Sequence, residues 1–264
     1  MYQVSEIVIY PVKGLAGIQL QSSRVFEHGL EYDRNWMLID SENHFISQRQ
    51  NPLLALFVTQ IDEENLIITY NNSKLVVSLS AASDEKLTIT VWDDKASVTP
   101  VSDEADQWFS EQLGNRVRLV KLASTTARQH TASTTSQTFD VSLADAYPFL
   151  ILGWESLFYL NKKMETPLSM NRFRPNIVIN TSLAHEEDDW QEFTIGNDVR
   201  LCNIKPCGRC QVVTIDQSTA EVDSTPLKVL NTYRKQGNNV NFGMNAICKQ
   251  VGSISVGDQI HIHT

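Results

Sequence analysis

Two cysteines three positions apart, Cys207 and Cys210, stand in the segment NIKPCGRCQVVTID at residues 203–216. Thiolates are nucleophiles and soft metal ligands, so this spacing allows a metal site, a redox dithiol, or one working thiolate with a second cysteine beside it. Lys205 and Arg209 would favour the charged form of a thiolate in this segment. The structural alternative is that both cysteines are small buried hydrophobic side chains.

With Cys202 and Cys248, the pair follows the pattern C-x4-C-x2-C and a distant C, which matches plant-type 2Fe-2S spacing and also suits a four-thiolate zinc site. Against such a site, Cys202 falls in an alternating apolar run that predicts a strand, and Pro206 removes a backbone donor from the loop. A thioredoxin-like dithiol needs a helix after its second cysteine, whereas QVVTID predicts a strand. These residues favour a single reactive or metal-bound thiolate, with Cys202 and Cys248 as buried hydrophobic residues.

Basic side chains recur at places where a strand end or a turn does not require them. Lys13 ends the segment YPVK before a glycine, Arg34 stands in EYDRNW, and Arg172 and Arg174 stand in MNRFRPNIVI, shortly before Asn176. Each one alone fits a solvated surface charge. Together they predict a local anion site, because arginine binds phosphate in a bidentate manner, and an asparagine can both donate to and accept from a heterocycle.

The elements that must position these residues are mainly strands. Six short segments of the first hundred residues are rich in β-branched and aromatic residues and are separated by polar turns. They are residues 3–12, 33–40, 54–61, 65–71, 74–80 and 87–94. Strands at this spacing are typical of a sandwich or barrel.

The rest of the chain predicts a few helices among further strands. Helices are expected from Ser102 to Gly114, from Trp154 to Met164 and in residues 225–237, and strands in residues 116–122, 175–180, 198–204, 211–216 and at the C-terminal end. The Ser/Thr-rich segment 123–139 predicts a mobile boundary, and its His130 is expected to be solvent-exposed. The fold class is therefore mainly β with a few helices, α+β.

The composition of the chain argues against some classes of binding partner. The chain has 264 residues and a net charge of −9, which opposes binding to nucleic acid or to an anionic membrane. Its N-terminus does not resemble a signal peptide, and no apolar run approaches the length of a membrane span. Four cysteines are too few for a disulfide scaffold, so a cytoplasmic protein with reduced thiols is expected.

Seven segments resemble the MOSC family in order along nearly the whole chain, and they resemble its branch with an N-terminal β-barrel most closely. The segments are YPVKG, DRNWMLID, ISQRQNPLLALF, ADAYPFLIL, NRFRPNIVI, KPCGRC and VGDQI. This branch includes amidoxime-reducing components and bacterial reductases of N-hydroxylated bases. The resemblance implies a β-barrel-like N-terminal domain over residues 1–120 and a MOSC β-barrel domain over residues 121–264.

The resemblance also implies a molybdenum-pyranopterin cofactor, with Cys210 as the metal ligand and Cys207 as a neighbour. Arg209 would act at the catalytic centre by tuning the charge of that thiolate. Gly14 occupies a position where relatives often have serine, and Asp145 lies on a family motif with no role assigned. The residues implied to bind the cofactor are Lys13, Gly14, Arg34, Arg174, Asn176, Gly208, Arg209 and Cys210.

The function implied is reduction of small N-hydroxylated compounds. The chain ends without a ferredoxin domain, so electrons are expected from a separate flavin reductase, ferredoxin or cytochrome of b5 type. The alternative function is a sulfur or molybdenum-cofactor carrier with a persulfide on Cys210. A third possibility is a binding module that has kept the fold and lost the chemistry.

Overall fold

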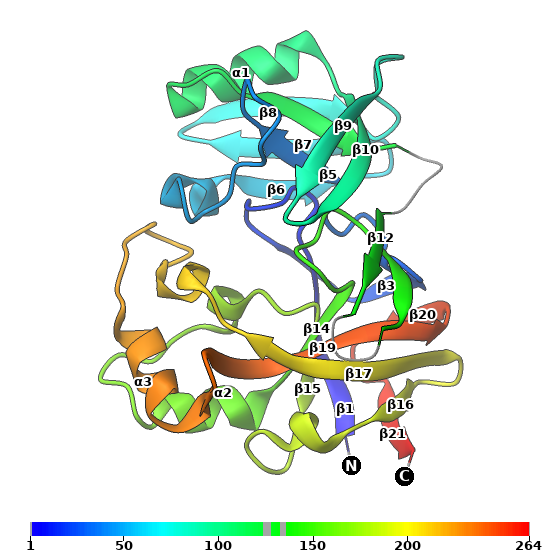
Figure 1. Cartoon of the computed structure of the whole chain (residues 1–264), viewed down its shortest axis with the longest axis vertical. Helices are drawn as coiled ribbons and strands as arrows, with labels where there is room; N and C mark the ends of the chain where they lie inside the picture. Colours follow the sequence, from blue (N-terminus) through cyan, green and yellow to red (C-terminus); the bar gives the residue numbers. More distant parts are fainter. Residues whose placement is uncertain (1, 124–127, 133–135, 264) are drawn as a thin grey trace.

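The computed structural model describes residues 2–123, 128–132 and 136–263. This part of the chain is mostly β-strand and forms a closed barrel and a half-barrel, with a few helices outside them (Figure 1). The prediction of a mainly β, α+β fold with an N-terminal β-barrel-like part and a β-barrel part is confirmed. None of the helices in the described ranges is long and apolar enough to cross a membrane.

Within the described residues, seven strands of the larger sheet close into a ring, because β14 pairs with β15 on one side and with β19 on the other. Alternating apolar residues such as Val4, Phe193 and Leu201 fill its interior. The ring runs in the order β14 (Phe149–Gly153), β15 (Ile177–Asn180), β1 (Tyr2–Ile9), β21 (Gln259–His263), β16 (Glu192–Ile195), β17 (Val199–Gly208) and β19 (Asn239–Gln250).

Shorter strands lie outside the ring. They pair with β1, β19 or each other and are β2 (Ile18–Leu20), β18 (Lys235–Gln236), β3 (Ser22–Phe26), β4 (Gly29–Leu30) and β20 (Gly252–Ser255). Three of them, β20, β3 and β4, form a separate sheet. Strand pairing therefore crosses the domain boundary predicted at residue 120, since β1 and β3 pair with strands from the C-terminal part of the chain. The assignment of residues 1–120 and 121–264 to two domains stays a prediction.

The half-barrel lobe is built from antiparallel strands around Trp36, Phe57 and Phe109, which are fully buried. Its strands are β5 (Trp36–Ile39), β9 (Leu87–Val91), β10 (Asp94–Pro100), β11 (Arg118–Leu122), β6 (Val58–Ile61), β7 (Asn65–Tyr70) and β8 (Ser73–Ser78). Helix α1 (Asp103–Leu113) covers it and ends as predicted, with Ser102 accepting from the Ala105 amide and Gly114 in the left-handed region.

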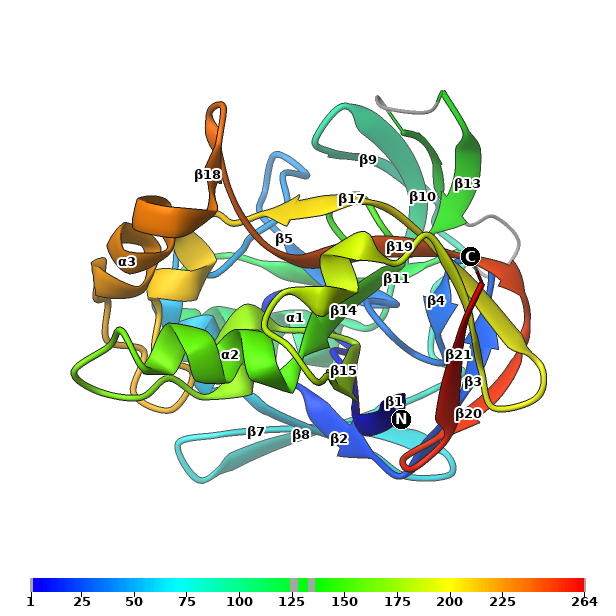
Figure 2. The same cartoon turned by 90° about the horizontal axis from the view of Figure 1, so that it is seen from below.

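The remaining helices pack at one end of the barrel, where they share a core with β15 and β19 (Figures 1 and 2). Among the described residues, these helices are α2 (Trp154–Asn161), α3 (Thr225–Arg234) and the 3-10 helices η2 (Met170–Phe173), η3 (Glu186–Asp189) and η4 (Gln211–Thr214). Another 3-10 helix, η1 (Pro52–Leu56), packs Leu54 into the core of the half-barrel lobe. The strand predicted at QVVTID was wrong, because these residues form η4 directly after Cys210.

The Ser/Thr-rich segment was also predicted incorrectly where it is described. Strands β12 (Arg128–Thr131) and β13 (Thr138–Val141) pair in antiparallel fashion, and buried Arg128 ties the first of them to Asp94. The prediction of mobility for residues 124–127 and 133–135 lies outside the described residues. Polar strands of this kind give no hydrophobic alternation, so the sequence pattern does not reveal them.

Closure of the barrel generates a test of stability at Gly243. This residue of β19 has φ of 78°, and a Cβ added to it would lie 2.7 Å from the carbonyl oxygen of Ile151 in β14. Gly243→Ala should lower the free energy of unfolding by about 2–4 kcal/mol, from backbone strain and the clash together. Urea denaturation measures this change.

Gly237→Ala is the matched control, because Gly237 has φ of 59° but no atom within 4 Å of the added Cβ. It should cost only the backbone strain, about 1 kcal/mol. Equal losses in the two variants would contradict a tight contact between β14 and β19.

Candidate functional site

Residues of both lobes line a cavity of about 420 Å³. Every residue that the sequence implied for cofactor binding lies on its wall, namely Lys13, Gly14, Arg34, Arg174, Asn176, Gly208, Arg209 and Cys210. These residues come from the loop after β1, the turn before β5, the turn after η2, and the end of β17 with the loop that follows it. The structure thus brings the residues together, and their individual roles stay predictions.

The loop after β17 gives its two cysteines different surroundings. Arg209 donates from its backbone amide to the Val240 oxygen at 2.7 Å, which fixes the loop against β19. Its guanidinium lies 3.1 Å from Cys207 Sγ through Nη1 and 2.8 Å from the Phe173 oxygen through Nη2. Arg209 therefore contacts Cys207, whereas the sequence placed its charge at Cys210.

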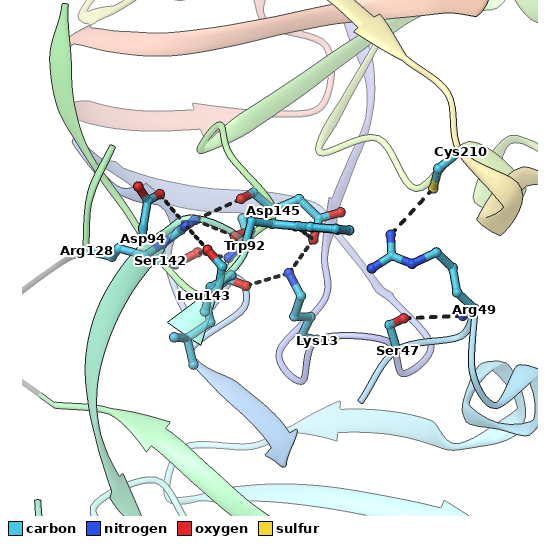
Figure 3. A network of polar contacts seen from close by, with 12 residues as sticks. Lys13, Ser47, Arg49, Trp92, Asp94, Arg128, Ser142, Leu143, Asp145 and Cys210 are labelled. Atoms are coloured by element: carbon cyan, nitrogen blue, oxygen red, sulfur yellow. Dashed lines mark hydrogen bonds and ion pairs between the residues drawn. The ribbon is translucent and has the colours of Figure 1, made fainter. Parts of the chain in front are cut away.

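Arg49 is the cation that contacts Cys210. Its Nη1 lies 3.9 Å from Sγ of Cys210, and the Cys210 residue is exposed (Figure 3). Arg49 comes from the half-barrel lobe, 161 positions away in the chain. Its segment, ISQRQNPLLALF, belongs to the family resemblance, but nothing in the local spacing identified Arg49 as a site residue.

Arg34 and Arg174 converge on one aromatic ring. Their guanidinium carbons lie 4.3 and 4.1 Å from the ring centre of Tyr10, and Arg34 also pairs with buried Asp33 at 2.5 Å. Both arginines have positive φ, 51° and 56°, so local turns direct their side chains toward the cavity. Burial lowers the pKa of Arg174 to about 10 and raises that of Tyr10 to about 12.

Lys13 and Asp145 form an ion pair of 2.5 Å, and Lys13 Nζ also donates to the Leu143 oxygen at 2.9 Å (Figure 3). Burial lowers the pKa of Lys13, whose side chain is 8% exposed, although Asp145 opposes the shift. The Asp145 carboxylate is 58% exposed because it faces the cavity. Desolvation opposes its charge, but Lys13 prevails and holds the pKa of Asp145 well below its usual range.

Several predicted polar residues have structural partners. Asn176 accepts from the Leu150 amide and donates to the Val8 oxygen, both at 3.2 Å, so it braces β1 against β14. Arg172 pairs with Asp216 at 2.6 Å outside the cavity wall. His130 is partly buried with Nδ1 2.7 Å from Asp94, so the expectation that it is solvent-exposed was wrong.

The four cysteines do not converge on one site. Cys202 packs beside Tyr147 and Ile247, while Cys248 packs against the barrel core, and both are only partly buried. Burial raises the pKa of Cys202 and raises that of Cys248 to about 11, as expected for hydrophobic thiols. In the described part of the chain, no three His, Cys, Asp or Glu side chains are grouped to hold a metal ion.

Charge at the cavity is unbalanced. Among the described residues, four cations on its wall have no carboxylate within 4.0 Å, namely Arg49, Arg174, Lys205 and Arg209. The buried Nε of Arg209 also has no hydrogen-bond partner in the described structure. In a protein of net charge −9, this excess favours an anionic ligand, and the exposed thiol of Cys210 adds a soft metal ligand. The wall therefore fits a phosphate-bearing cofactor with a thiophilic metal.

The sequence matches the models of two known protein domains. Residues 1–116 match the MOSC N-terminal beta barrel domain, and residues 138–261 match the MOSC domain. The chain belongs to the MOSC family, in the branch that has the N-terminal domain. The family resemblance of the sequence is thereby confirmed.

The chain is also similar to individual proteins, two by sequence and one by structure. The chain is 32% identical over 277 residues to mitochondrial amidoxime reducing component 2 of Bos taurus, covering 98% of this chain and 82% of that protein. It is 29% identical over 266 residues to the molybdenum cofactor sulfurase of Oryza sativa subsp. japonica, covering 91% of this chain and 32% of that protein. The crystal structure of the YUAD protein from Bacillus subtilis aligns with a TM-score of 0.44 at 10% identity, over 100% of this chain and 98% of that one.

Thiol alkylation tests the contrast among the cysteines. Cys210 is exposed, whereas the pKa of Cys248 is raised from 9.0 to about 11, which lowers its thiolate fraction roughly 100-fold at neutral pH. Brief treatment of the native protein with iodoacetamide should modify Cys210 first and Cys248 last, as read by peptide mass spectrometry. Rapid modification of Cys248 would contradict its burial, and denatured protein provides the reference in which all four react.

The ion pair of Lys13 generates a pH-dependent prediction. Asp145→Asn should cost about 1–2 kcal/mol of unfolding free energy at pH 7, a modest value because solvent reaches the carboxylate. The folded-state pKa of Asp145 is depressed, so its contribution is complete above the unfolded pKa of about 3.9 and is lost as the pH falls further. Urea denaturation at pH 7 and pH 3 should therefore show a smaller penalty at pH 3.

Asp84→Asn serves as the control for this measurement, because Asp84 is an exposed carboxylate. It should change the unfolding free energy little at either pH. A penalty for Asp145→Asn that is the same at both pH values would indicate lost packing rather than a lost charge.

Proposed function

We propose that this protein is a molybdenum-cofactor-dependent oxidoreductase that reduces small N-hydroxylated compounds, with Cys210 as the protein ligand of the metal. The observation that carries the proposal is the exposed Cys210 thiol on the wall of a cavity where four described cations have no carboxylate within 4.0 Å. Similarity to amidoxime reducing components supports the reaction type. Reduction consumes two electrons and two protons and converts the N–OH group to N–H with release of water.

Different side chains of the cavity would bind different parts of such a cofactor. Lys13, Arg34 and Arg174 present positive charge to a phosphate and to the polar edge of a pterin. The bound cofactor would supply the metal centre that transfers two electrons to the N–O bond. Cys210 would provide the thiolate, and Arg49 would lie beside it from the half-barrel lobe.

The protons of the reaction do not come from Asp145. Its pKa is held well below the usual range by Lys13, so at neutral pH its carboxylate only accepts hydrogen bonds. It thereby orients the ammonium group of Lys13 on the cavity wall. Protons for the released water are supplied by solvent, since the cavity is open to it at the exposed Cys210.

The electrons require a separate protein, for which a flavin reductase, a ferredoxin or a cytochrome of b5 type remain the candidates. The proposed setting is the cytoplasm, with neither nucleic acid nor membrane as partner, in keeping with the net charge of −9.

A second candidate function is transfer of sulfur or of the molybdenum cofactor through a Cys210 persulfide. Similarity to molybdenum cofactor sulfurases favours it, as does the exposure of Cys210, which leaves room for an added sulfur atom. Mass spectrometry of freshly purified protein separates the candidates: a persulfide on Cys210 without molybdenum supports the carrier, and about one molybdenum per chain supports the reductase.

Substitution of each cysteine tests the proposed roles. In protein produced with cofactor supply, Cys210→Ser should abolish amidoxime reduction with an artificial electron donor, because the metal loses its thiolate ligand. Cys207→Ser should retain most molybdenum and activity, since Cys207 contacts Arg209 instead. Metal analysis and activity assays measure both, and the reverse pattern would show that Cys207 is the ligand.

A further inference from the structure

Trp92 occupies a place in the chain that a tryptophan seldom takes. It forms the turn between β9 and β10, whose residues Val91 and Asp94 are paired, and its φ is 58°. Two-residue hairpin turns with positive φ favour asparagine or glycine, and a bulky residue there is strained. The side chain is also 49% exposed, so burial in a core does not explain it. Such an outlier calls for a functional explanation.

Three side chains hold the indole in place. Its Nε1 donates to Asp145 Oδ1 at 3.1 Å, the guanidinium carbon of Arg49 lies 4.5 Å from the ring centre, and Phe45 approaches edge-on at 5.5 Å. The first two of these residues line the cavity. Trp92 is therefore fixed beside the cavity, although it belongs to the half-barrel lobe.

The indole also lies close to the proposed reaction centre. Figure 3 shows the ring between Asp145 and Arg49, with Cys210 beyond the guanidinium. Because Arg49 contacts both the ring and the thiol, the ring centre is no more than about 10 Å from Cys210 Sγ. An aryl group packed on this ring could present an attached N–O group to the centre.

We propose that Trp92, with Phe45 beside it, forms a subsite for the aromatic ring of the substrate. This proposal rests on the proposed function. The protein then prefers aryl amidoximes and other N-hydroxylated aromatic compounds over small aliphatic ones. Aromatic rings stack in offset or edge-to-face geometry, and the guanidinium plane of Arg49 offers a second stacking surface. An aliphatic substrate gains neither contact.

The subsite explains why the indole is both strained and exposed. Asp145 and Arg49 fix its orientation before any ligand arrives, so stacking costs little ordering of the side chain. A partly exposed aromatic ring beside a cavity is the kind of surface that ligand sites use. A residue needed only to complete the turn would be small and polar.

Steady-state kinetics of the cofactor-loaded protein test the subsite with benzamidoxime and acetamidoxime as the paired substrates. Trp92→Ala should lower kcat/KM for benzamidoxime about 3- to 10-fold through KM, and should change that for acetamidoxime less than about 2-fold. Trp92→Phe should restore most of the preference, because it keeps a stacking surface. Trp154→Ala is the control, since Trp154 lies on α2 and is 38% exposed.

Equal losses for both substrates would overturn the subsite, because Trp92 would then act only through Arg49 and Asp145. A calorimetric titration with benzamidine, which the protein cannot reduce, provides a readout independent of turnover. Trp92→Ala should weaken benzamidine binding about 3- to 10-fold, while Trp154→Ala should not. If the wild-type protein reduces neither amidoxime, the proposed function fails, and the titration still decides the subsite: unchanged binding in Trp92→Ala excludes it.

Discussion

The pairing of β19 with its neighbours is the constraint on which the rest of the structure depends. This strand pairs with β17 along one edge and with β14 along the other, so it both closes the barrel and supports the cysteine loop. Two of the three register shifts in the pairing of β17 and β19 fall at Asn203/Lys205 and Pro206/Gly208, shortly before Cys210. Such irregularities end regular pairing and turn the chain, which here carries the loop away from the sheet and toward the cavity.

The cations on the cavity wall differ in whether a carboxylate offsets the free energy of burying their charge. Desolvated cations such as Arg174 cost folding free energy unless a counter-charge offsets them, and only some of the wall residues have one. Asp33 pairs with Arg34, and Asp145 pairs with Lys13. Among the described residues, Arg49 has no carboxylate partner and stacks on Trp92. Arg209 also has none among them and contacts the sulfur of Cys207. An anionic ligand would supply the missing counter-charge for these cations.

The sequence predicted the helices and many strands because their hydrophobic periods and caps are local properties. It missed β19, whose segment NVNFGMNAICKQ alternates poorly, and it extended the strand of β9 through Trp92, which the fold uses as a turn. Residues that line the cavity, such as Arg174 and Cys210, were predicted where sequence motifs contain them, and their roles stay predictions. Arg49 and Trp92 were missed because their importance arises only from contacts between segments far apart in the chain.

Cys207 and Cys210 differ in which parts of the chain must be folded before their surroundings are formed. Cys207 meets Arg209 from its own loop, so its environment forms whenever β17 and β19 pair. Cys210 meets Arg49, which is stacked on Trp92, so its environment forms only when the half-barrel lobe is folded and seated against the barrel. Under the proposed function, Cys210 would therefore have its full surroundings as a metal ligand only when both lobes are in place. The half-barrel lobe would then contribute to the proposed reaction centre, and the pairing of β1 and β3 with strands from the C-terminal part of the chain ties the two parts together.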